Sequence, residues 1–427
     1  MEDDSIPVTV LSGTLGAGKT TVLNHVLRET DDDLAVLVND MGEVNVDAEQ
    51  VAESSDIADE DEELVELSNG CICCELRGDL LDAIGELTRE REFDAIVVES
   101  TGVAEPLPVA QTLTLGFDQS DLDPTEFYEE TGIEPLSGCH LDTTVTVVDA
   151  HQFQAAMESD EILDDDGTKK HLGDLLVEQV EFCDVLLVNK CDLVDDLTLE
   201  KIESTVEALQ PRAEIVRTEH GRIEPEHIVE TGRFDFEEAS HSAGWIQELQ
   251  EPHQSAEEEH GVTSFVFEAR RPFHPERFAD LLDRFPDEVV RAKGHFWIAN
   301  REDEALTLNV AGQSVRIAPG GQWVAALDSE ERRERLEENP DLEALWDEQW
   351  GDRSNQLVLI GTEMDHESVR ADLEDCLLAD DELDADHSAY DDRFPTFEPE
   401  EPADDDDAVD ADENGDHQTQ EEIGIAD

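Results

Sequence analysis

The feature that most constrains this chain lies within its first two dozen residues. An apolar run at 8–11 ends in residues 13–20, which read G-T-L-G-A-G-K-T, and residues 21–27 then have the apolar spacing of a buried helix. Glycines let backbone N–H groups turn toward phosphate oxygens, and a helix N-terminus adds a favourable dipole. The order of strand, loop and helix therefore predicts a phosphate-binding loop. A glycine-rich turn without a ligand is the alternative.

Two side chains of this loop have specific roles in such a site. Lys19 is expected to reach the β- and γ-phosphates, and the Thr20 hydroxyl is expected to bind Mg²⁺. The residues predicted to bind the nucleotide here are Gly13, Gly16, Ala17, Gly18, Lys19, Thr20 and Thr21.

Length, composition and charge limit the number of domains and the kinds of partner. The 427 residues are enough for two domains, and 113 Asp and Glu against 27 Lys and Arg give a formal net charge of −86. Because basic side chains must neutralise phosphates, this balance disfavours nucleic acid and anionic membranes as partners. Acids spread along the whole chain favour a halophilic surface in a high-salt cytoplasm, where screening tolerates self-repulsion. A carboxylate-rich cation store is the alternative.

The cysteines and the N-terminus bear on the compartment. Seven cysteines, an odd number with three of them at 71–74, do not suggest a disulfide framework, so a reducing cytosol fits better. The first residues lack the basic and apolar regions of a signal peptide, and no apolar run approaches membrane-spanning length. We expect a cytoplasmic protein without a membrane partner.

A second strand of the site is predicted at 93–99, an apolar run that ends in an acid. Glu99 would hold Mg²⁺ through its water shell, as in the Walker-B arrangement, and Gly102 can bring a backbone N–H to the γ-phosphate. The alternative is a buried strand with a chance terminal acid.

Another apolar run, 34–39, leads into an acidic loop that contains Asp40 and Glu43. Such a loop beside a nucleotide often holds Mg²⁺ or switches with the γ-phosphate. A solvated acidic turn is the alternative.

Three cysteines lie between these nucleotide motifs. Cys71, Cys73 and Cys74 follow a glycine and precede a helix-like segment at 80–87. Three thiols this close can converge on one soft or borderline metal and leave the fourth position to another side chain, water or a recipient. An incomplete tetrahedron favours a transfer site over a closed structural one. Burial of the thiols as small apolar groups and a thioredoxin-like redox role are the alternatives.

The base is predicted by N-K-C-D, which follows the apolar run 184–188. The Asp192 carboxylate would accept the N1–H and exocyclic amine protons of guanine, a donor pair that adenine does not present. Asn189 would hold the loop and reach the base N7, and the stem of Lys190 would pack along the base. The motif favours GTP over ATP, and it weakens the alternative of an ATP-using kinase. Cys191 is expected to pack and not to bind metal.

The remaining patterns predict the domains. Residues 1–235 form an α/β P-loop NTPase domain with a mostly parallel sheet, in which 111–142 is expected to be an insertion or a mobile segment. Polar residues 236–261, with three histidines, are expected to be a linker, and metal relay by these histidines is an alternative. Strand patterns with a helix near each end predict a smaller α+β domain over 262–378. Residues 379–427 are expected to be an acidic disordered tail.

A small basic cluster stands out in the second domain. Arg291, Lys293 and His295 alternate along one expected strand in an otherwise acidic chain. A local ion pair and a functional contact are both consistent with this pattern.

Together these motifs resemble the CobW-type family of P-loop GTPases, which act as metal chaperones or insertases. In order, they are G-T-L-G-A-G-K-T-T, N-D-M-G-E-V-N-V-D, N-G-C-I-C-C-E-L-R-G-D-L, V-V-E-S-T-G-V-A-E-P, N-K-C-D, R-A-K-G-H-F-W and G-G-Q-W. C-x-C-C between the first nucleotide motifs is rarely met elsewhere among GTPases. The resemblance covers nearly all of the chain except the insertion, the linker and the tail.

The resemblance implies a GTP-hydrolysing metallochaperone that uses Lys19, Thr20 and Glu99 with GTP and Mg²⁺. It would bind Zn²⁺, or alternatively Co²⁺, at the C-x-C-C cysteines, with loops around Glu43 and Glu99 linking metal to nucleotide. Its partner would be an apo-metalloprotein recipient, and the chaperone itself a monomer or homodimer. Family members are linked to zinc supply, cobalt delivery for cobalamin synthesis and nitrile hydratase activation. A nucleotide-gated metal sensor or sequestering protein with incidental hydrolysis is the rival.

Overall fold

The computed structural model of this 427-residue chain describes most of two folded regions. The described residues are 5–39, 63–67, 77–90, 93–104, 106–116, 138–157, 159, 162–165, 168–235, 239, 262–286, 288–339, 342, 346–383 and 385–396.

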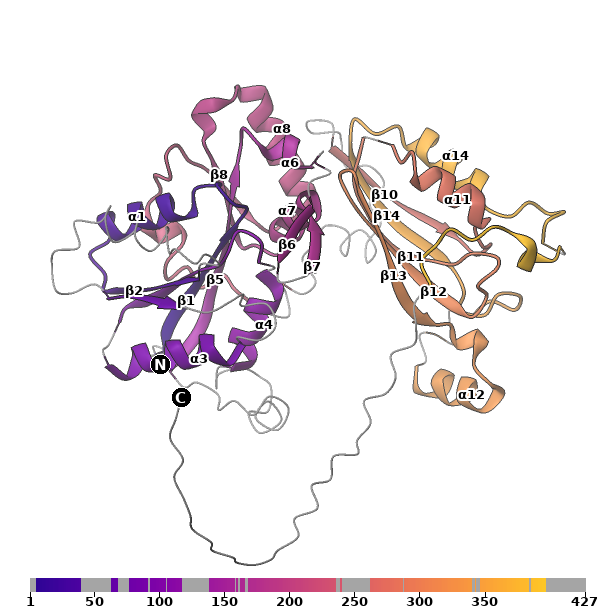
Figure 1. Ribbon diagram of the computed structural model, residues 1–427, viewed down its shortest axis with the longest axis horizontal. Helices are drawn as coiled ribbons and strands as arrows, with labels where there is room; N and C mark the ends of the chain where they lie inside the picture. The colour runs from indigo at the N-terminus through magenta and orange to yellow at the C-terminus, as the bar shows by residue number, and fades with distance from the viewer. Residues whose placement is uncertain are drawn as a thin grey trace, which may run out of the picture. The chain divides into compact units, whose positions relative to one another are not determined.

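The first region is built on a seven-stranded sheet in the order β3-β2-β4-β1-β5-β8-β9 (Figure 1). The strands are β1 (Ile6–Gly13), β2 (Leu34–Asn39), β3 (Glu63–Leu67), β4 (Ala95–Glu99), β5 (Cys139–Asp149), β8 (Val185–Asn189) and β9 (Glu214–Arg217). Every neighbouring pair is parallel. Central strands of such a sheet are covered on both faces, which explains why their sequences read as continuous apolar runs. The expected P-loop NTPase fold is confirmed.

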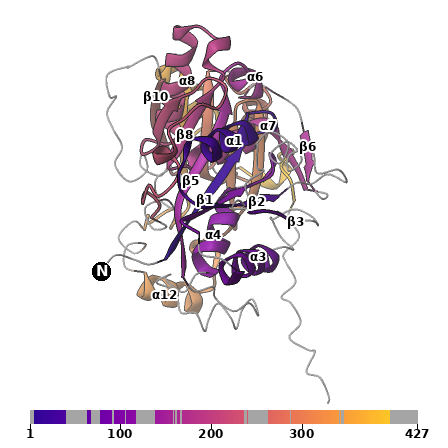
Figure 2. The same cartoon turned by 90° about the vertical axis from the view of Figure 1, so that its left-hand side faces the viewer.

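Helices cover both faces of this sheet (Figure 2). They are α1 (Lys19–Glu29), α3 (Arg77–Glu90), α4 (Pro106–Gly116), α6 (Phe153–Met157), α7 (Leu172–Glu181) and α8 (Asp196–Leu209). Along β1, Val8 and Val10 pack with α3 and α4, whereas Leu11 packs with α1. The short strands β6 (Ile162–Asp165) and β7 (Thr168–His171) form a separate pair before α7. No described helix is both long enough and apolar enough to cross a membrane.

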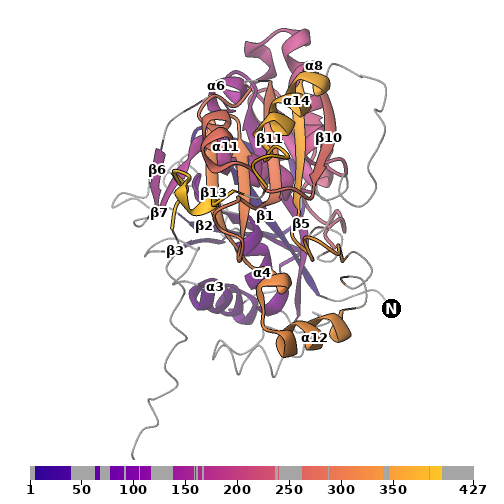
Figure 3. The ribbon, with the colours of Figure 1, turned by 90° about the vertical axis from the view of Figure 1, so that its right-hand side faces the viewer.

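The second region is a five-stranded sheet in the order β10-β14-β11-β12-β13, in which every neighbouring pair is antiparallel. Its elements are β10 (Val262–Ala269), α11 (Pro275–Leu282), β11 (Val289–Phe296), β12 (Glu304–Ala311), β13 (Ser314–Gln322), α12 (Ser329–Glu338), β14 (Asn355–Thr362) and α14 (His366–Cys376). The helices α11 and α14 cover one face (Figure 3). The expected α+β domain is confirmed.

Both faces of the second sheet carry apolar residues. On β14, Leu357 and Leu359 join the core under α11 and α14, whereas Val358 and Ile360 join the cluster of α6, α7 and α8. The period of two along a strand sends these neighbours to opposite faces. The second sheet therefore packs directly on helices of the first region.

Residues 111–142 differ at both ends from the expected insertion. The helix α4 continues to Gly116, with Leu113 fully buried in the core, and β5 begins at Cys139. The acids, proline and glycine of this stretch suggested irregular structure, but its first residues belong to a buried helix and its last residues to a central strand. The remainder, 117–137, lies outside the described residues.

The expected disordered tail from residue 379 is wrong for its described part. Phe394 is only 6% exposed and packs near Phe278 and Phe296. Acids of this segment pair with arginines of the preceding domain, since Arg277 binds Glu382 at 2.6 Å and an arginine on the β11–β12 connection, Arg301, binds Asp392 at 2.7 Å. The segment up to Phe394 is therefore packed against the second domain despite its acid-rich composition.

This packing predicts that Phe394→Ala lowers the free energy of unfolding by about 3 kcal/mol, because a buried aromatic ring is replaced by a cavity. Denaturant unfolding of the full chain measures the change. Asp391→Ala, at an exposed position three residues earlier, is the control and should change it by less than about 0.5 kcal/mol. An unchanged unfolding midpoint for Phe394→Ala would contradict the assigned packing.

Candidate functional site

The candidate site lies where the central strands of the parallel sheet end. Strand β1 ends at Gly13, β4 at Glu99, β5 at Asp149 and β8 at Asn189. The register pairs Leu11 with Glu99, and Asp149 with Asn189. The connection after β1 leads to β2 on one side of β1, whereas the connection after β4 leads to β5 on the other side. In α/β sheets, ligands bind at such a switch point, outside the carboxyl ends of the strands.

The loop between β1 and α1 depends on three glycines with positive φ. Their φ angles are +141° at Gly13, +78° at Gly16 and +107° at Gly18, a region that side chains disfavour. A Cβ on Gly13 would lie 2.3 Å from the Val147 carbonyl oxygen, and one on Gly18 would lie 2.4 Å from Asn189 Nδ2. Glycine is therefore required here for backbone shape and for close approach.

The two side chains expected to bind phosphate and Mg²⁺ face this loop. Lys19 Nζ donates to the Gly13 carbonyl oxygen at 2.8 Å and is buried. Thr20 Oγ1 donates to Glu99 Oε1 at 3.0 Å, although the two residues are 79 positions apart. The hydroxyl and the buried carboxylate are hard oxygen donors, so this pair fits Mg²⁺. Thr21 lies on the exposed side of α1.

The loop after β4 touches the phosphate loop. Ser100 Oγ lies 3.1 Å from Ser12 Oγ, and both side chains are buried. A Cβ on Gly102 would lie 2.7 Å from the backbone nitrogen of Leu15, so glycine permits this contact. The sequence prediction missed Ser12 and Ser100, because nothing in their local pattern marks them.

On the other side, Asn189 ties two loops together. Its Nδ2 donates to the Ala17 carbonyl oxygen at 2.9 Å, and its Oδ1 accepts from the Gly221 backbone N–H at 3.1 Å. The expected role in holding the loop thus has a defined geometry. The segment containing Gly221 was missed by the sequence prediction, because it follows the edge strand β9 and carries no recognised motif.

Lys190 links the phosphate loop to a further acid. Its Nζ donates to the Gly16 carbonyl oxygen and to Asp149 Oδ2, both at 2.7 Å. The backbone of Lys190 has a φ of +61°, an uncommon conformation for a residue other than glycine. Asp149 was missed, although an acid ending a buried strand is the same signal that identified Glu99.

The remaining residues of the base motif differ in exposure. The Asp192 side chain is 32% exposed, and its Oδ2 lies 3.9 Å from Nε2 of the exposed His220. Cys191 is half-buried, and its Sγ donates to the Val188 carbonyl oxygen at 3.0 Å. Burial raises the pKa of the Cys191 thiol. These contacts agree with packing by Cys191 and leave Asp192 accessible to a base.

Four of the expected metal ligands, Glu43, Cys71, Cys73 and Cys74, lie outside the described residues. Within the described ranges, no group of three or more His, Cys, Asp or Glu side chains could hold a metal ion. Among the described cysteines, Cys139, Cys183, Cys191 and Cys376, none forms a disulfide.

The position of Asp192 predicts a change of base preference. In Asp192→Asn, one of the two acceptor oxygens becomes an NH₂ group, which would face a guanine donor. GTP affinity should therefore fall by about 100-fold, the scale of a lost charged hydrogen bond. Xanthine carries an oxygen in place of the guanine amino group, so affinity for xanthosine triphosphate should rise. Equilibrium titration with both nucleotides measures this. Asp196→Asn, an exposed change of the same charge on α8, should leave both affinities unchanged; equal losses in the two variants would contradict the assignment.

Comparison with known proteins identifies the family of both folded regions. Residues 7–217 match the CobW/HypB/UreG nucleotide-binding domain, and residues 262–377 match the cobalamin synthesis protein CobW C-terminal domain. The chain is 38% identical over 399 residues to zinc-regulated GTPase metalloprotein activator 1 of Dictyostelium discoideum, covering 89% of this chain and 81% of the relative. It is 28% identical over 378 residues to the zinc chaperone YjiA of Escherichia coli, covering 86% and 97% of the two chains.

Solved structures include Zn(II)-bound YjiA GTPase from E. coli, which aligns with a TM-score of 0.38 and 22% identity over 87% of this chain and 99% of that one. The family assignment rests on the sequence matches, which span both folded regions. The chain belongs to the CobW/HypB/UreG family of P-loop GTPases and carries the CobW C-terminal domain.

Proposed function

We propose that this protein is a GTP-hydrolysing metallochaperone that carries zinc on Cys71, Cys73 and Cys74 and delivers it to an apo-metalloprotein. The observation that carries the proposal is 38% identity, over 89% of the chain, to a zinc-regulated GTPase metalloprotein activator. A second relative at 28% identity is a zinc chaperone. Both names favour zinc over cobalt, whereas thiolates themselves accept either metal.

GTP is the substrate of the nucleotide half of this reaction. Phosphoryl transfer to water relies mainly on positioning and charge stabilisation, so few groups need to react covalently. We assign the catalytic roles to Lys19, Thr20 and Glu99. Lys19 can exchange its bond to the Gly13 carbonyl for a phosphate oxygen without leaving the loop. We assign nucleotide binding to Gly13, Gly16, Ala17, Gly18, Lys19, Thr20, Thr21, Gly102, Asn189, Lys190 and Asp192.

Thr20 and Glu99 would hold Mg²⁺, which supplies charge neutralisation on the phosphates when bound. The same two side chains already lie in hydrogen-bond contact, so the protein brings both oxygens to one place. Glu43 is a further proposed ligand on the connection that follows β2.

The metal half of the site is supported by chain order and sheet topology. The cysteines occur in the connection between β3, which ends at Leu67, and α3, which begins at Arg77. The strand β3 is parallel to β1 and lies three strand positions from it. At the usual strand spacing, the chain leaves β3 about 14 Å across the sheet from β1, at the same edge as the phosphate loop. This proximity supports communication between cargo and nucleotide.

The compartment follows from the same chemistry. We infer a cytoplasmic protein, because a thiol carrier requires reduced cysteines. The charge of −86 supports the inference of a high-salt cytoplasm.

Coupling between metal and nucleotide is tested by reciprocal binding measurements. Zinc affinity should change when Mg²⁺ and a non-hydrolysable GTP analogue are present, and analogue affinity should change by the same factor when zinc is present. Transfer of zinc to an apo acceptor should then follow GTP hydrolysis. Identical zinc affinities with and without nucleotide would contradict the coupling. Tight retention of zinc through hydrolysis would contradict delivery and favour a sensor or sequestering protein.

The cysteine assignment has its own test. Cys73→Ser should weaken zinc binding by about tenfold or more, because a soft thiolate is replaced by a hydroxyl. GTP binding without zinc should stay unchanged, since the cysteine is not part of the phosphate loop. Cys376→Ser alters a buried thiol in the second domain and should leave zinc affinity as in the wild type. Equal zinc affinities for Cys73→Ser and the wild type would remove the cysteines from the metal site.

A further inference from the structure

The helix α7 contacts the nucleotide site through one buried side chain. Gln179 is fully buried, and its Nε2 donates to the Ala104 carbonyl oxygen at 3.1 Å. The backbone of the same residue is also held, because Thr146 Oγ1 donates to the Gln179 carbonyl oxygen at 2.8 Å. Gln179 thus joins α7 to β5 and to the segment that follows β4.

The bonded carbonyl belongs to the loop that leaves Glu99 and passes the phosphate loop. The Ala104 N–H donates to the Thr101 carbonyl oxygen at 3.1 Å, which closes a turn around Gly102. Gly102 in turn lies against the tip of the phosphate loop at Leu15. A side chain that fixes Ala104 therefore fixes the end of a short turn whose middle residue is expected to face the γ-phosphate.

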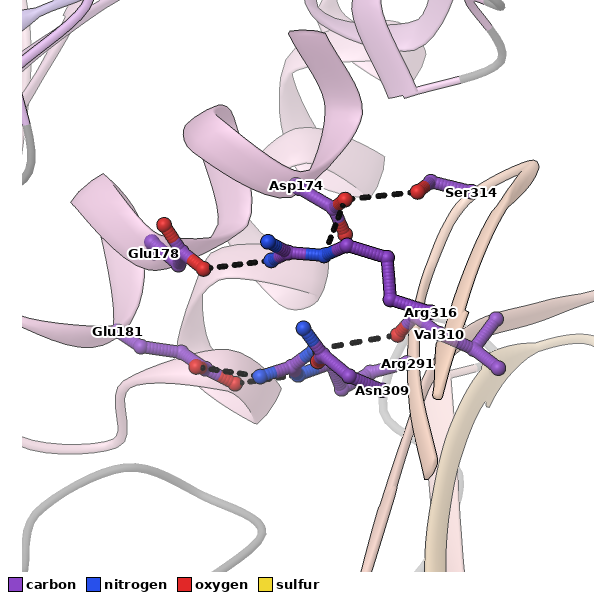
Figure 4. A network of polar contacts seen from close by, with 8 residues as sticks. All are labelled: Asp174, Glu178, Glu181, Arg291, Asn309, Val310, Ser314 and Arg316. Atoms are coloured by element: carbon purple, nitrogen blue, oxygen red, sulfur yellow. Dashed lines mark hydrogen bonds and ion pairs between the residues drawn. The ribbon is translucent and has the colours of Figure 1, made fainter. Parts of the chain in front are cut away.

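The opposite side of α7 is bound to the second sheet by ion pairs (Figure 4). Arg291 on β11 donates to both carboxylate oxygens of Glu181, at 2.7 and 2.9 Å, and its side chain is 1% exposed. Arg316 on β13 pairs with Asp174 and Glu178, each at 2.8 Å. The structure therefore shows an ion pair for Arg291, one of the two expected alternatives for the basic cluster, but its partner Glu181 is 110 positions away along the chain.

These contacts fix the rotation of α7 about its axis. Gln179 and Glu181 are two positions apart, which at 3.6 residues per turn places them about 200° apart around the helix. One faces Ala104 and the other faces Arg291. A rotation of α7 that separated Glu181 from Arg291 would leave two buried charges unpaired, which is strongly destabilising. The ion pair therefore opposes such a rotation. The same rotation would move the Gln179 amide away from Ala104.

We infer that Gln179 is a positioning residue for GTP hydrolysis, which holds the Thr101–Ala104 turn in place, and that the second sheet sets its position through the Glu181–Arg291 ion pair. The inference rests on GTP hydrolysis by this chain and not on metal delivery. We expect GDP affinity to depend less on this turn than hydrolysis does, because GDP lacks the γ-phosphate.

The test uses Gln179→Leu in the full chain, which keeps a similar volume and removes the donor. The single-turnover rate constant for bound GTP, which does not depend on the fraction of active protein, should fall by about tenfold, the scale of a lost buried hydrogen bond. The affinity for GDP should stay within twofold of wild type. Val180→Ala is the control, since Val180 is equally buried in α7 but packs in the apolar cluster away from the turn. It should destabilise the fold without slowing hydrolysis.

The contribution of the sheet is tested with the paired variant Glu181→Leu/Arg291→Leu, which removes both charges together. Its single-turnover rate constant should fall in the same direction, and adding Gln179→Leu should cause no further loss, because both changes act through one turn. Unchanged hydrolysis in Gln179→Leu, or equal slowing in Val180→Ala, would overturn the positioning role. Multiplicative effects in the triple variant would overturn the link to the sheet. Absence of GTP hydrolysis in the wild type would instead refute the proposed function itself.

Discussion

The nucleotide site depends on the buried side chain of Asn189, which joins three strand ends in one set of contacts. Its amide holds the Ala17 carbonyl of the phosphate loop on one side and the Gly221 N–H after β9 on the other. The absence of a Cβ at Gly18 allows this approach. The phosphate loop and the loop after β9 are therefore not positioned independently, because a shift of β8 would move both loops at once.

A second constraint is the use of both faces of the antiparallel sheet. One face packs under α11 and α14, and the other packs on the helices of the GTPase domain. A sheet with one solvated face would have left the two regions free to move apart. Here the apolar contacts are reinforced at α7 by Arg291 and Arg316. Along the chain, this helix follows the strand that ends in Asp149 and precedes the strand that ends in Asn189, so the second domain packs on an element that connects two strands of the candidate site.

Some of the few cations of this acidic chain lie at internal contacts. Of the 27 Lys and Arg, two arginines illustrate this: the side chains of Arg291 and Arg301 are 1% and 10% exposed. Each neutralises a carboxylate that would be costly to bury alone. The segment that contains Asp392 and Phe394 combines such a pair with an aromatic anchor, so its acidic composition did not prevent folding.

The sequence by itself determined the elements whose signals are local. The phosphate loop, the apolar strands and the N-K-C-D motif could be predicted because glycine spacing and hydrophobic period reflect short-range backbone requirements. The contact between Thr20 and Glu99 was also predictable, since parallel strand ends meet at one edge. Only the tertiary structure decided which distant groups complete the site. Gln179 meets Ala104 across 75 positions and Arg291 meets Glu181 across 110, and such pairings depend on helix rotation and sheet packing that leave no pattern in neighbouring residues.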